Sequence, residues 1–139
     1  VIMHIRGTPK NMQVDPVYDD VVTEIMAFLR RQSNYAVKAG VDERKIILDP
    51  GIGFGKRIED NLRILKMLHV FKELGKPVLV GTSMKSFIGK ITDSNLEQRV
   101  EGTLATVAVA LMNGADIFRV HDVGRTSKVL KMVKAVMDA

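Results

Sequence analysis

Cysteine and tryptophan are both absent from this sequence, and aromatic residues make up only 5% of its 139 positions. Without cysteine, the chain cannot be a disulfide-stapled scaffold, a zinc finger or a thiol enzyme. Only three histidines are present, which argues against a dedicated transition-metal site. The scarcity of aromatic rings argues against a stacking platform for single-stranded nucleic acid. These absences fit a reducing, cytoplasmic location, which we predict.

Long hydrophobic segments are also missing. The longest largely apolar stretch, Leu104 to Met112, is far shorter than the roughly 20 residues of a membrane span. No basic segment followed by an apolar one opens the chain, so we expect neither a signal peptide nor a membrane partner. The chain begins at Val1, without a methionine and inside an apparent strand, and we interpret this as a truncation point.

The charge balance is moderately basic, with 21 Lys and Arg against 16 Asp and Glu and a net charge of +5. Such a balance suits nucleic acid, an anionic membrane surface or phosphate-bearing substrates. The basic residues are scattered along the sequence. As the explanation of this charge we therefore favour binding of small anionic ligands first, a solvated surface second and nucleic acid third. A hydrophobic content of 46% over this length predicts one domain with a real core.

Four short apolar runs, each followed by a helical pattern, dominate the sequence. The predicted strands are residues 1–5, 45–49, 77–82 and 116–121. Strands that alternate with helices predict a parallel α/β sheet, and their continuous apolar character predicts that both faces are buried. Either an open doubly wound sheet or part of a (β/α)8 barrel would satisfy this pattern. Four units would be half of a barrel of roughly 250 residues, with the chemistry at the carboxyl ends of the strands.

The helical patterns have recognisable ends. Asp15 and Pro16 are a candidate N-cap and first helical residue, and Gly40 is a candidate stop for the same helix. A second helix is predicted from about residue 60 to residue 75, a third from about 96 to 112, and a last one capped by Thr126 or Ser127. The inward positions predicted for the second and last helices are Leu62, Leu65, Leu68 and Phe71, then Val129, Leu130, Val133 and Val136.

Polar residues follow all four predicted strands, where a barrel would bring them to one mouth. They are His4 and Arg6; Asp49 and the loop to Lys56; Ser83, Lys85 and Ser86; and Arg119, His121 and Asp122. A single polar strand end is commonly a cap or a surface residue. Four in succession predict a binding site.

Asp49 either caps the turn at Pro50 and Gly51 or presents a buried carboxylate that could bind two adjacent N–H donors of a ligand. The glycine-rich string from Gly51 to Lys56 is not a Walker A motif, because it reads GIGFGK followed by Arg57. It is either a flexible loop or a tight backbone path past a planar ligand, with Phe54 as an apolar wall.

Lys85, between two serines, is either a solvated surface lysine or a ligand contact. Arg119 and His121 are two positions apart on a strand, so they point the same way. An arginine that faces the interior needs a partner. That partner is either Asp122 or an anion, which Gly124 and the start of the last helix would also favour.

Four strings together resemble the C-terminal half of dihydropteroate synthase: MHIRGTPKNMQ, DPGIGFGK, GTSMKSFIG and GTLATVAVALMNGADIFRVHDV. They occur in that family's order and cover essentially the whole chain. The resemblance implies a (β/α)8 barrel of the pterin-binding superfamily, with residues 1–139 as a partial barrel domain that supplies strands five to eight. The N-terminal half would then be absent, and we expect this chain alone to be weakly active or inactive.

That family condenses 6-hydroxymethyl-7,8-dihydropterin diphosphate with p-aminobenzoate, giving 7,8-dihydropteroate and pyrophosphate for folate biosynthesis. By resemblance, Asp49 would bind the pterin N–H groups, and Lys85 would contact the pterin beside the p-aminobenzoate site. Phe54 and Ser86 would line that second site, and Gly81 would belong to the same substrate-binding set.

The resemblance also implies how the reaction is promoted. Positive charge develops on the pterin methylene as diphosphate leaves, and Arg119, His121 and Mg²⁺ would stabilise the leaving group. With Lys85, these two side chains are the expected catalytic residues. The family's asparagine ligand for the metal lies in the absent half, so no metal ligand is expected here. The full-length protein would be a homodimer.

One residue departs from the family pattern, because Met84 stands where the family's SRKS motif has arginine. Two alternatives to the synthase remain open. One is the pterin-binding domain of a methyltetrahydrofolate methyltransferase, against which GTSMKSFIG and RVHDV argue. The other is a non-catalytic half-barrel that binds pterin or pairs with a second half, since two open sheet edges would need cover.

Overall fold

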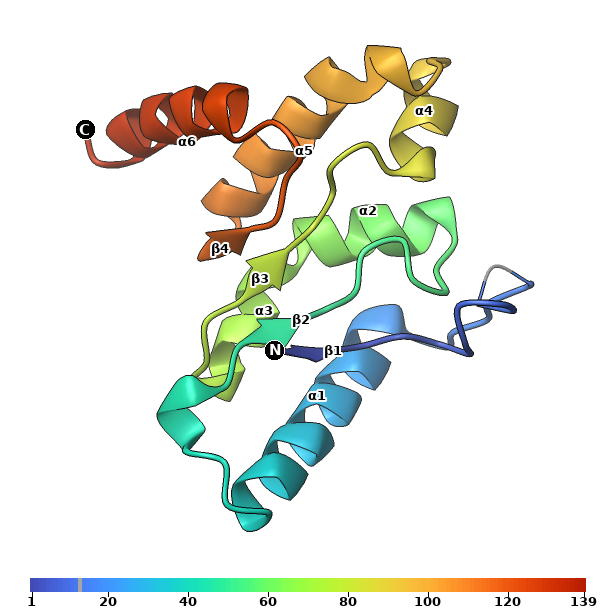
Figure 1. The fold of residues 1–139 in the computed structure, drawn as a ribbon, viewed down its shortest axis with the longest axis vertical. Coiled ribbons are helices and arrows are strands. Elements are labelled where there is room, and N and C mark those ends of the chain that lie inside the picture. Colours follow the sequence, from blue (N-terminus) through green and yellow to red (C-terminus); the bar gives the residue numbers. More distant parts are fainter. Residues whose placement is uncertain (13) are drawn as a thin grey trace.

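The computed structural model describes residues 1–12 and 14–139 as one row of short parallel strands with helices beside it (Figure 1). The strands are β1 Ile2–Met3, β2 Leu48–Asp49, β3 Leu79–Val80 and β4 Ile117–Phe118. β1 pairs with β2 and β3 with β4, both in parallel, and a parallel bridge between Leu48 and Val78 joins the two pairs. The predicted parallel α/β pattern is confirmed. Among the described residues, β1 and β4 each have only one neighbour.

Helices fill the intervals that the sequence pattern assigns to them. They are α1 Val21–Lys38, α2 Ile58–Lys66, α3 Leu68–Phe71, α4 Ser86–Thr92, α5 Val100–Met112 and α6 Val123–Met137. Short 3-10 turns occupy Glu43–Lys45, Lys72–Leu74 and Glu97–Arg99. In the described part of the chain, no helix is both long enough and apolar enough to cross a membrane.

The predicted start of the first helix at Asp15 and Pro16 is wrong. The helix begins at Val21, where the Asp20 side chain accepts a hydrogen bond from the Thr23 amide at 2.8 Å. Asp15 instead has a left-handed backbone with φ of 42°. The Tyr18 hydroxyl donates to the carbonyl of Gly55 at 2.6 Å, which holds the chain before α1 out of a helical path.

The predicted second helix is broken at Met67 into α2, α3 and a 3-10 turn, and it ends at Gly75 with φ of 66°, as predicted. Leu65, Leu68 and Phe71 are buried, as predicted. Leu62 is wrong as an inward residue, because 45% of it is exposed. The neighbouring Asn61 takes the inward position and donates to the carbonyl of Arg57 at 2.8 Å.

The last helix also begins earlier than predicted. Asp122, and not Thr126 or Ser127, is its N-cap and accepts from the amide of Arg125 at 2.9 Å. The predicted apolar face is only partly covered. Val129, Leu130 and Val133 are half-buried, and Val136 is 65% exposed.

The core lies between the sheet and the helices, and its largest fully buried side chains include Ile25, Leu29, Ile64 and Phe71. The strands contribute through alternate residues. Leu48, Val78 and Val80 are buried, whereas Asp49, Leu79, Ile117 and Phe118 are only half-buried. The prediction that both faces of the sheet are buried is therefore wrong, because the described helices cover only one of them.

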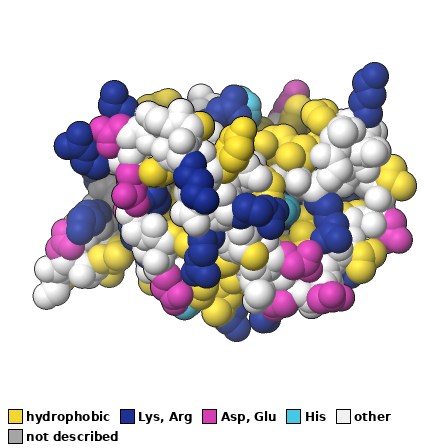
Figure 2. Space-filling model, turned by 90° about the horizontal axis from the view of Figure 1, so that it is seen from below, with side chains coloured by type: hydrophobic (Ala, Val, Ile, Leu, Met, Phe, Trp, Pro, Cys, Tyr) yellow, Lys and Arg dark blue, Asp and Glu magenta, His cyan; other side chains and the backbone are white. Residues whose placement is uncertain are grey.

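Charged side chains on the drawn surface are dispersed among apolar ones and form no single basic patch (Figure 2). This arrangement agrees with the scatter of Lys and Arg along the sequence.

Candidate functional site

A pocket of about 270 Å³ opens where the strands end, and it collects side chains from all four βα units. Six of the seven predicted site residues line it: Asp49, Phe54, Gly81, Lys85, Arg119 and His121. The pocket also includes Met3, Ile52, Ser83 and Val120, of which the sequence analysis had singled out only Ser83. Ser86 does not line it. This serine begins α4 and borders a separate pocket of about 310 Å³ beside Gly53 and Lys56.

Asp49, the last residue of β2, is half-buried in this pocket. Its Oδ1 accepts a hydrogen bond from the Gly51 amide at 2.7 Å, so the residue caps the turn and also presents its carboxylate to the pocket. Burial raises the pKa of Asp49. The bond from Gly51 and the positive charges of Lys56, Lys85 and Arg119 lower it in part.

The loop after Asp49 needs glycine where it crosses the backbone that follows β1, and its path past a planar ligand stays a prediction. Gly51 and Gly55 have φ of 72° and 64°, in the left-handed region. A Cβ on Gly51 would overlap the carbonyl oxygen of His4, and one on Gly55 would overlap that of Arg6. The loop therefore crosses closely over the backbone that follows β1.

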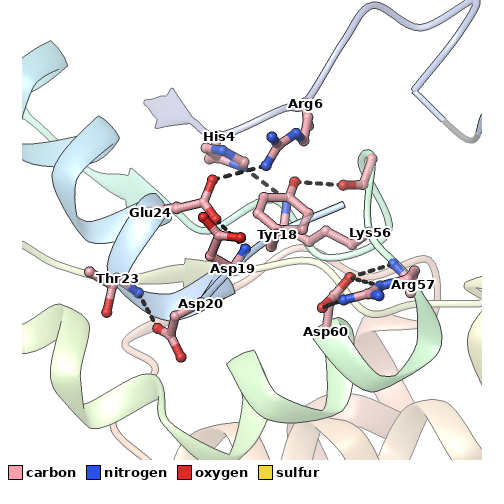
Figure 3. A network of polar contacts seen from close by, with 11 residues as sticks. His4, Arg6, Tyr18, Asp19, Asp20, Thr23, Glu24, Lys56, Arg57 and Asp60 are labelled. Atoms are coloured by element: carbon pink, nitrogen blue, oxygen red, sulfur yellow. Dashed lines mark hydrogen bonds and ion pairs between the residues drawn. The ribbon is translucent and has the colours of Figure 1, made fainter. Parts of the chain in front are cut away.

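A polar network from β1 and α1 lies beside this loop (Figure 3). The buried Lys56 donates to the carbonyl of Phe54 at 3.0 Å, and its Nζ lies 3.1 Å from Nδ1 of His4. Arg6 pairs with Glu24 at 2.9 Å and stacks 4.4 Å from the ring centre of Tyr18. His4 and Arg6 thus support the loop and do not line the pocket, contrary to the predicted convergence of all four strand ends.

Burial lowers the pKa values of two groups in this network, His4 and Lys56. Burial, and then the charge of Lys56, lower the pKa of His4 to about 4. Burial lowers the pKa of Lys56 to about 7, against the opposing attraction of Asp49 and Asp60. His4 is therefore neutral at physiological pH, and its Nδ1 can accept a hydrogen bond from Lys56.

Lys85 is a pocket residue and not a solvated surface lysine. Its Nζ lies 4.1 Å from the ring centre of Phe54, a cation–π contact. Burial lowers the pKa of Lys85, while the charge of Asp49 raises it in part.

Arg119 and His121 both reach the pocket, as their spacing predicts. Ser83 Oγ lies 2.8 Å from His121 Nδ1 and accepts from the His121 amide at 3.3 Å. The alternative pairing of Arg119 with Asp122 is not what the structure shows, because Asp122 caps α6 and lies 3.4 Å from Arg125. The pocket thus combines one carboxylate with cationic groups. It can bind a planar N–H donor at Asp49 and an anion at Arg119 and His121.

Across residues 1–12 and 14–139, no three His, Asp, Glu or Cys side chains come together as a metal-ion site. The described residues alone therefore do not make up a Mg²⁺ site, and magnesium stays a prediction.

Sequence comparison agrees with this geometry. Residues 1–121 match the sequence model of the family described as "Pterin binding enzyme". The chain belongs to the pterin-binding enzyme family. The matched segment contains all seven predicted site residues, from Asp49 to His121.

Dihydropteroate synthases are among the curated relatives of this chain, which confirms the predicted resemblance. The chain is 42% identical over 138 residues to the enzyme of Haemophilus influenzae, covering 99% of the chain and 50% of the relative. It is 47% identical over 137 residues to that of Synechocystis, covering 98% of the chain and 47% of the relative. The chain therefore spans about half the length of the curated relatives it matches.

Solved structures of the same family superpose on the chain. The synthase of Yersinia pestis, crystallised with a sulfonamide drug complex, gives a TM-score of 0.96 at 42% identity, over 99% of this chain and 50% of that one. The synthase of Thermus thermophilus, in complex with 4-aminobenzoate, gives 0.91 at 40% identity, over 98% of this chain and 56% of that one. The fold is thus α/β and matches half of the synthase barrel, and not an open doubly wound sheet.

Proposed function

We propose that this chain is the C-terminal four βα units, strands five to eight, of a dihydropteroate synthase. Completed by the other half, it would condense 6-hydroxymethyl-7,8-dihydropterin diphosphate with p-aminobenzoate to 7,8-dihydropteroate and pyrophosphate. The observation that carries the proposal is the shared pocket. One half-buried carboxylate, Asp49, lies in it with Lys85, Arg119 and His121 at the carboxyl ends of the strands.

The residues divide the chemistry between them. Asp49 accepts hydrogen bonds from the N–H groups of the pterin and so fixes the carbon that reacts. Arg119 and His121 bind the diphosphate and stabilise the negative charge that grows on it as the bond to the pterin methylene breaks. The amine of p-aminobenzoate attacks with its own lone pair, so no strong base is required.

The second substrate belongs beside Lys85 and Phe54. The cation–π contact at 4.1 Å keeps the Lys85 ammonium and the Phe54 ring together at the rim of the pterin pocket. We propose that Ser86 contributes from its neighbouring pocket, whose lining also includes Gly53 next to Phe54. Structures of relatives solved with 4-aminobenzoate and with 6HMPPP support this choice of ligand class.

The direct test adds the missing half. The chain is produced together with the N-terminal half of the Haemophilus influenzae synthase, and pyrophosphate release is followed with and without p-aminobenzoate. We expect release that depends on p-aminobenzoate from the mixture and little from either half alone. Pterin binding without turnover would favour the non-catalytic binder. Methyl transfer from methyltetrahydrofolate to a corrinoid partner would favour the methyltransferase.

Two substitutions test the assigned roles in that assembly. Asp49→Asn should weaken pterin binding at least tenfold, whereas Asp93→Asn, at an exposed residue after α4, should leave it unchanged. Arg119→Ala should weaken binding of the diphosphate-bearing pterin much more than that of free pterin. Equal losses for both ligands would make Arg119 a structural residue.

A further inference from the structure

The turn between β3 and α4 has an unusual backbone at Met84. Its φ of 60° places a non-glycine residue in the left-handed region, a strained conformation that persists only where neighbours enforce it. The two flanking residues, Ser83 and Lys85, both line the pocket. The strained residue therefore separates two side chains that face the same site.

Thr103, on α5, holds the main chain of Met84 from one side. The Met84 amide donates to Thr103 Oγ1 at 3.0 Å, and that hydroxyl lies 3.8 Å from the Met84 sulfur. Thr103 is buried. A hydroxyl in this position is well placed to bind a backbone N–H that the left-handed turn has removed from regular secondary structure.

Arg99, just before α5, holds the other side. Its Nη1 donates to the Met84 carbonyl oxygen at 3.0 Å. The guanidinium lies across Gly89 of α4, where a Cβ would come within 2.9 Å of Arg99 Cζ. Within the described residues, Nε of Arg99 is buried and has no hydrogen-bond partner. The guanidinium of Arg99 is thus partly desolvated beside the turn, and leaving its Nε without a partner costs free energy of folding.

The consequences of the turn are visible at its two ends. Ser83 Oγ lies 2.8 Å from His121 Nδ1, and Lys85 Nζ lies 4.1 Å from the ring centre of Phe54. A return of Met84 to an ordinary backbone conformation would rotate the two flanking peptide groups. That rotation would turn the Cα–Cβ bonds of Ser83 and Lys85 and so redirect both side chains.

We propose that Thr103 and Arg99 are positioning residues that clamp Met84 in its left-handed conformation and thereby aim Ser83 at His121 and Lys85 into the pocket. Neither Thr103 nor Arg99 lines that pocket. The clamp binds main-chain atoms of Met84, so it acts on whichever side chain occupies this position. Its effect on turnover depends on the proposed synthase function, whereas its effect on His121 does not.

The test uses the chain completed by its N-terminal half, with Thr103→Val, which removes the hydroxyl at nearly constant shape. We expect a loss of about tenfold in kcat/KM and, in NMR spectra, a changed Nδ1 signal of His121 as the contact with Ser83 is lost. Thr103→Ser, which keeps the hydroxyl, should preserve both. Thr92→Val, on α4 and not bonded to Met84, is the matched control.

A rescue experiment separates the clamp from a merely structural role. Adding Met84→Gly to Thr103→Val should restore most of the lost activity and the His121 signal, because glycine adopts the left-handed conformation without strain. If Thr103→Val does not fold, Arg99→Met provides the same readouts. Unchanged His121 signals in the folded variant, or no rescue by Met84→Gly, would overturn the proposal. If the unsubstituted assembly makes no dihydropteroate, the His121 signals still decide the clamp while the proposed function fails.

Discussion

Helices α1 and α6 both have amphipathic sequences, but they are buried to very different extents. Six residues of α1 are buried, including Ile25 and Leu29, whereas Thr126 is the one buried residue of α6. The two helices flank opposite ends of the strand row (Figure 1). A groove of about 620 Å³ lies between β4 and α6, lined by Phe118 and Leu130 among others.

The difference between the two helices arises from their neighbours and not from their own sequences. α1 packs against β1 and α2, and the ring of its Phe28 contacts the His4 ring edge-on with centroids 5.0 Å apart. Within the described chain, α6 packs mainly on α5, and the groove toward β4 stays open. An amphipathic pattern predicts which face of a helix can be buried. Whether that face is buried depends on the elements that surround the helix.

The largest difference in the free energy of unfolding should come from substitutions of apolar residues in the two helices. Leu29→Ala should lower the free energy of unfolding by about 3 kcal/mol, because a fully buried leucine leaves a cavity. Val136→Ala, at a site 65% exposed, should change it by no more than about 0.5 kcal/mol. Urea unfolding of both variants measures the contrast. Similar losses would show that α6 is packed as firmly as α1.

His4 should make the stability of the α1 side depend on pH. The pKa of His4 is lowered to about 4 in the folded chain, so between pH 6.5 and 4 the unfolded state takes up a proton that the folded state does not. Stability should therefore fall by about 2 kcal/mol as the pH falls through this window, with solvent screening taken into account. Unfolding measured at pH 7 and pH 4 tests this.

His4→Asn keeps a hydrogen-bond acceptor near Lys56 and removes the titrating ring, so it should flatten that part of the profile. His69→Asn, at an exposed histidine of α3, is the matched control and should leave the slope in place. A slope that survives His4→Asn would assign it to other groups.

Addition of the complementary half should affect the two helices unequally. We expect amide hydrogen exchange to slow about tenfold or more in α6 and β4, because the uncovered groove would gain a neighbour. α1 is already packed and should change less than about threefold. Equal protection in both helices would show that the groove beside α6 is not what the second half covers.

The smallest contrast concerns the helix caps. Asp20 caps α1 and also lies 3.1 Å from Arg63, so Asp20→Ala should cost about 1 kcal/mol. Asp122 makes the equivalent cap on α6, but Asp122→Ala should cost about half as much, because α6 contributes less to the cooperative core. Urea unfolding, with helicity followed by circular dichroism, compares them, and a larger loss at Asp122 would reverse the ranking.

The positions of the strands could be predicted because four apolar runs alternate with helical patterns, and a parallel sheet gathers its strand ends at one edge. The same rule places Asp49, Lys85, Arg119 and His121 in one pocket. Ser86 falls outside it because the turn at Met84 directs Lys85 inward and starts α4 at the next residue.

Other features depend on contacts between distant parts of the chain and have no local signal. The sequence contains candidate caps at Asp15 and Asp20, and the bond from Tyr18 to Gly55, 37 positions away, favours the second. The burial of Lys56 depends on His4, 52 positions earlier. The left-handed Met84 is likewise maintained by Arg99 and Thr103 and not by its own residue type.

The strands pair in the order in which they are synthesised. Ile2 pairs with Leu48, Leu48 with Val78, and Leu79 with Ile117. Each pairing closes a loop of moderate and similar length, for which the entropic cost changes little. The units can thus dock one after another as the chain leaves the ribosome. Asp49 is translated about 4 to 14 seconds before His121, at roughly 5–20 residues per second, so these two pocket residues come together only after the fourth βα unit is made.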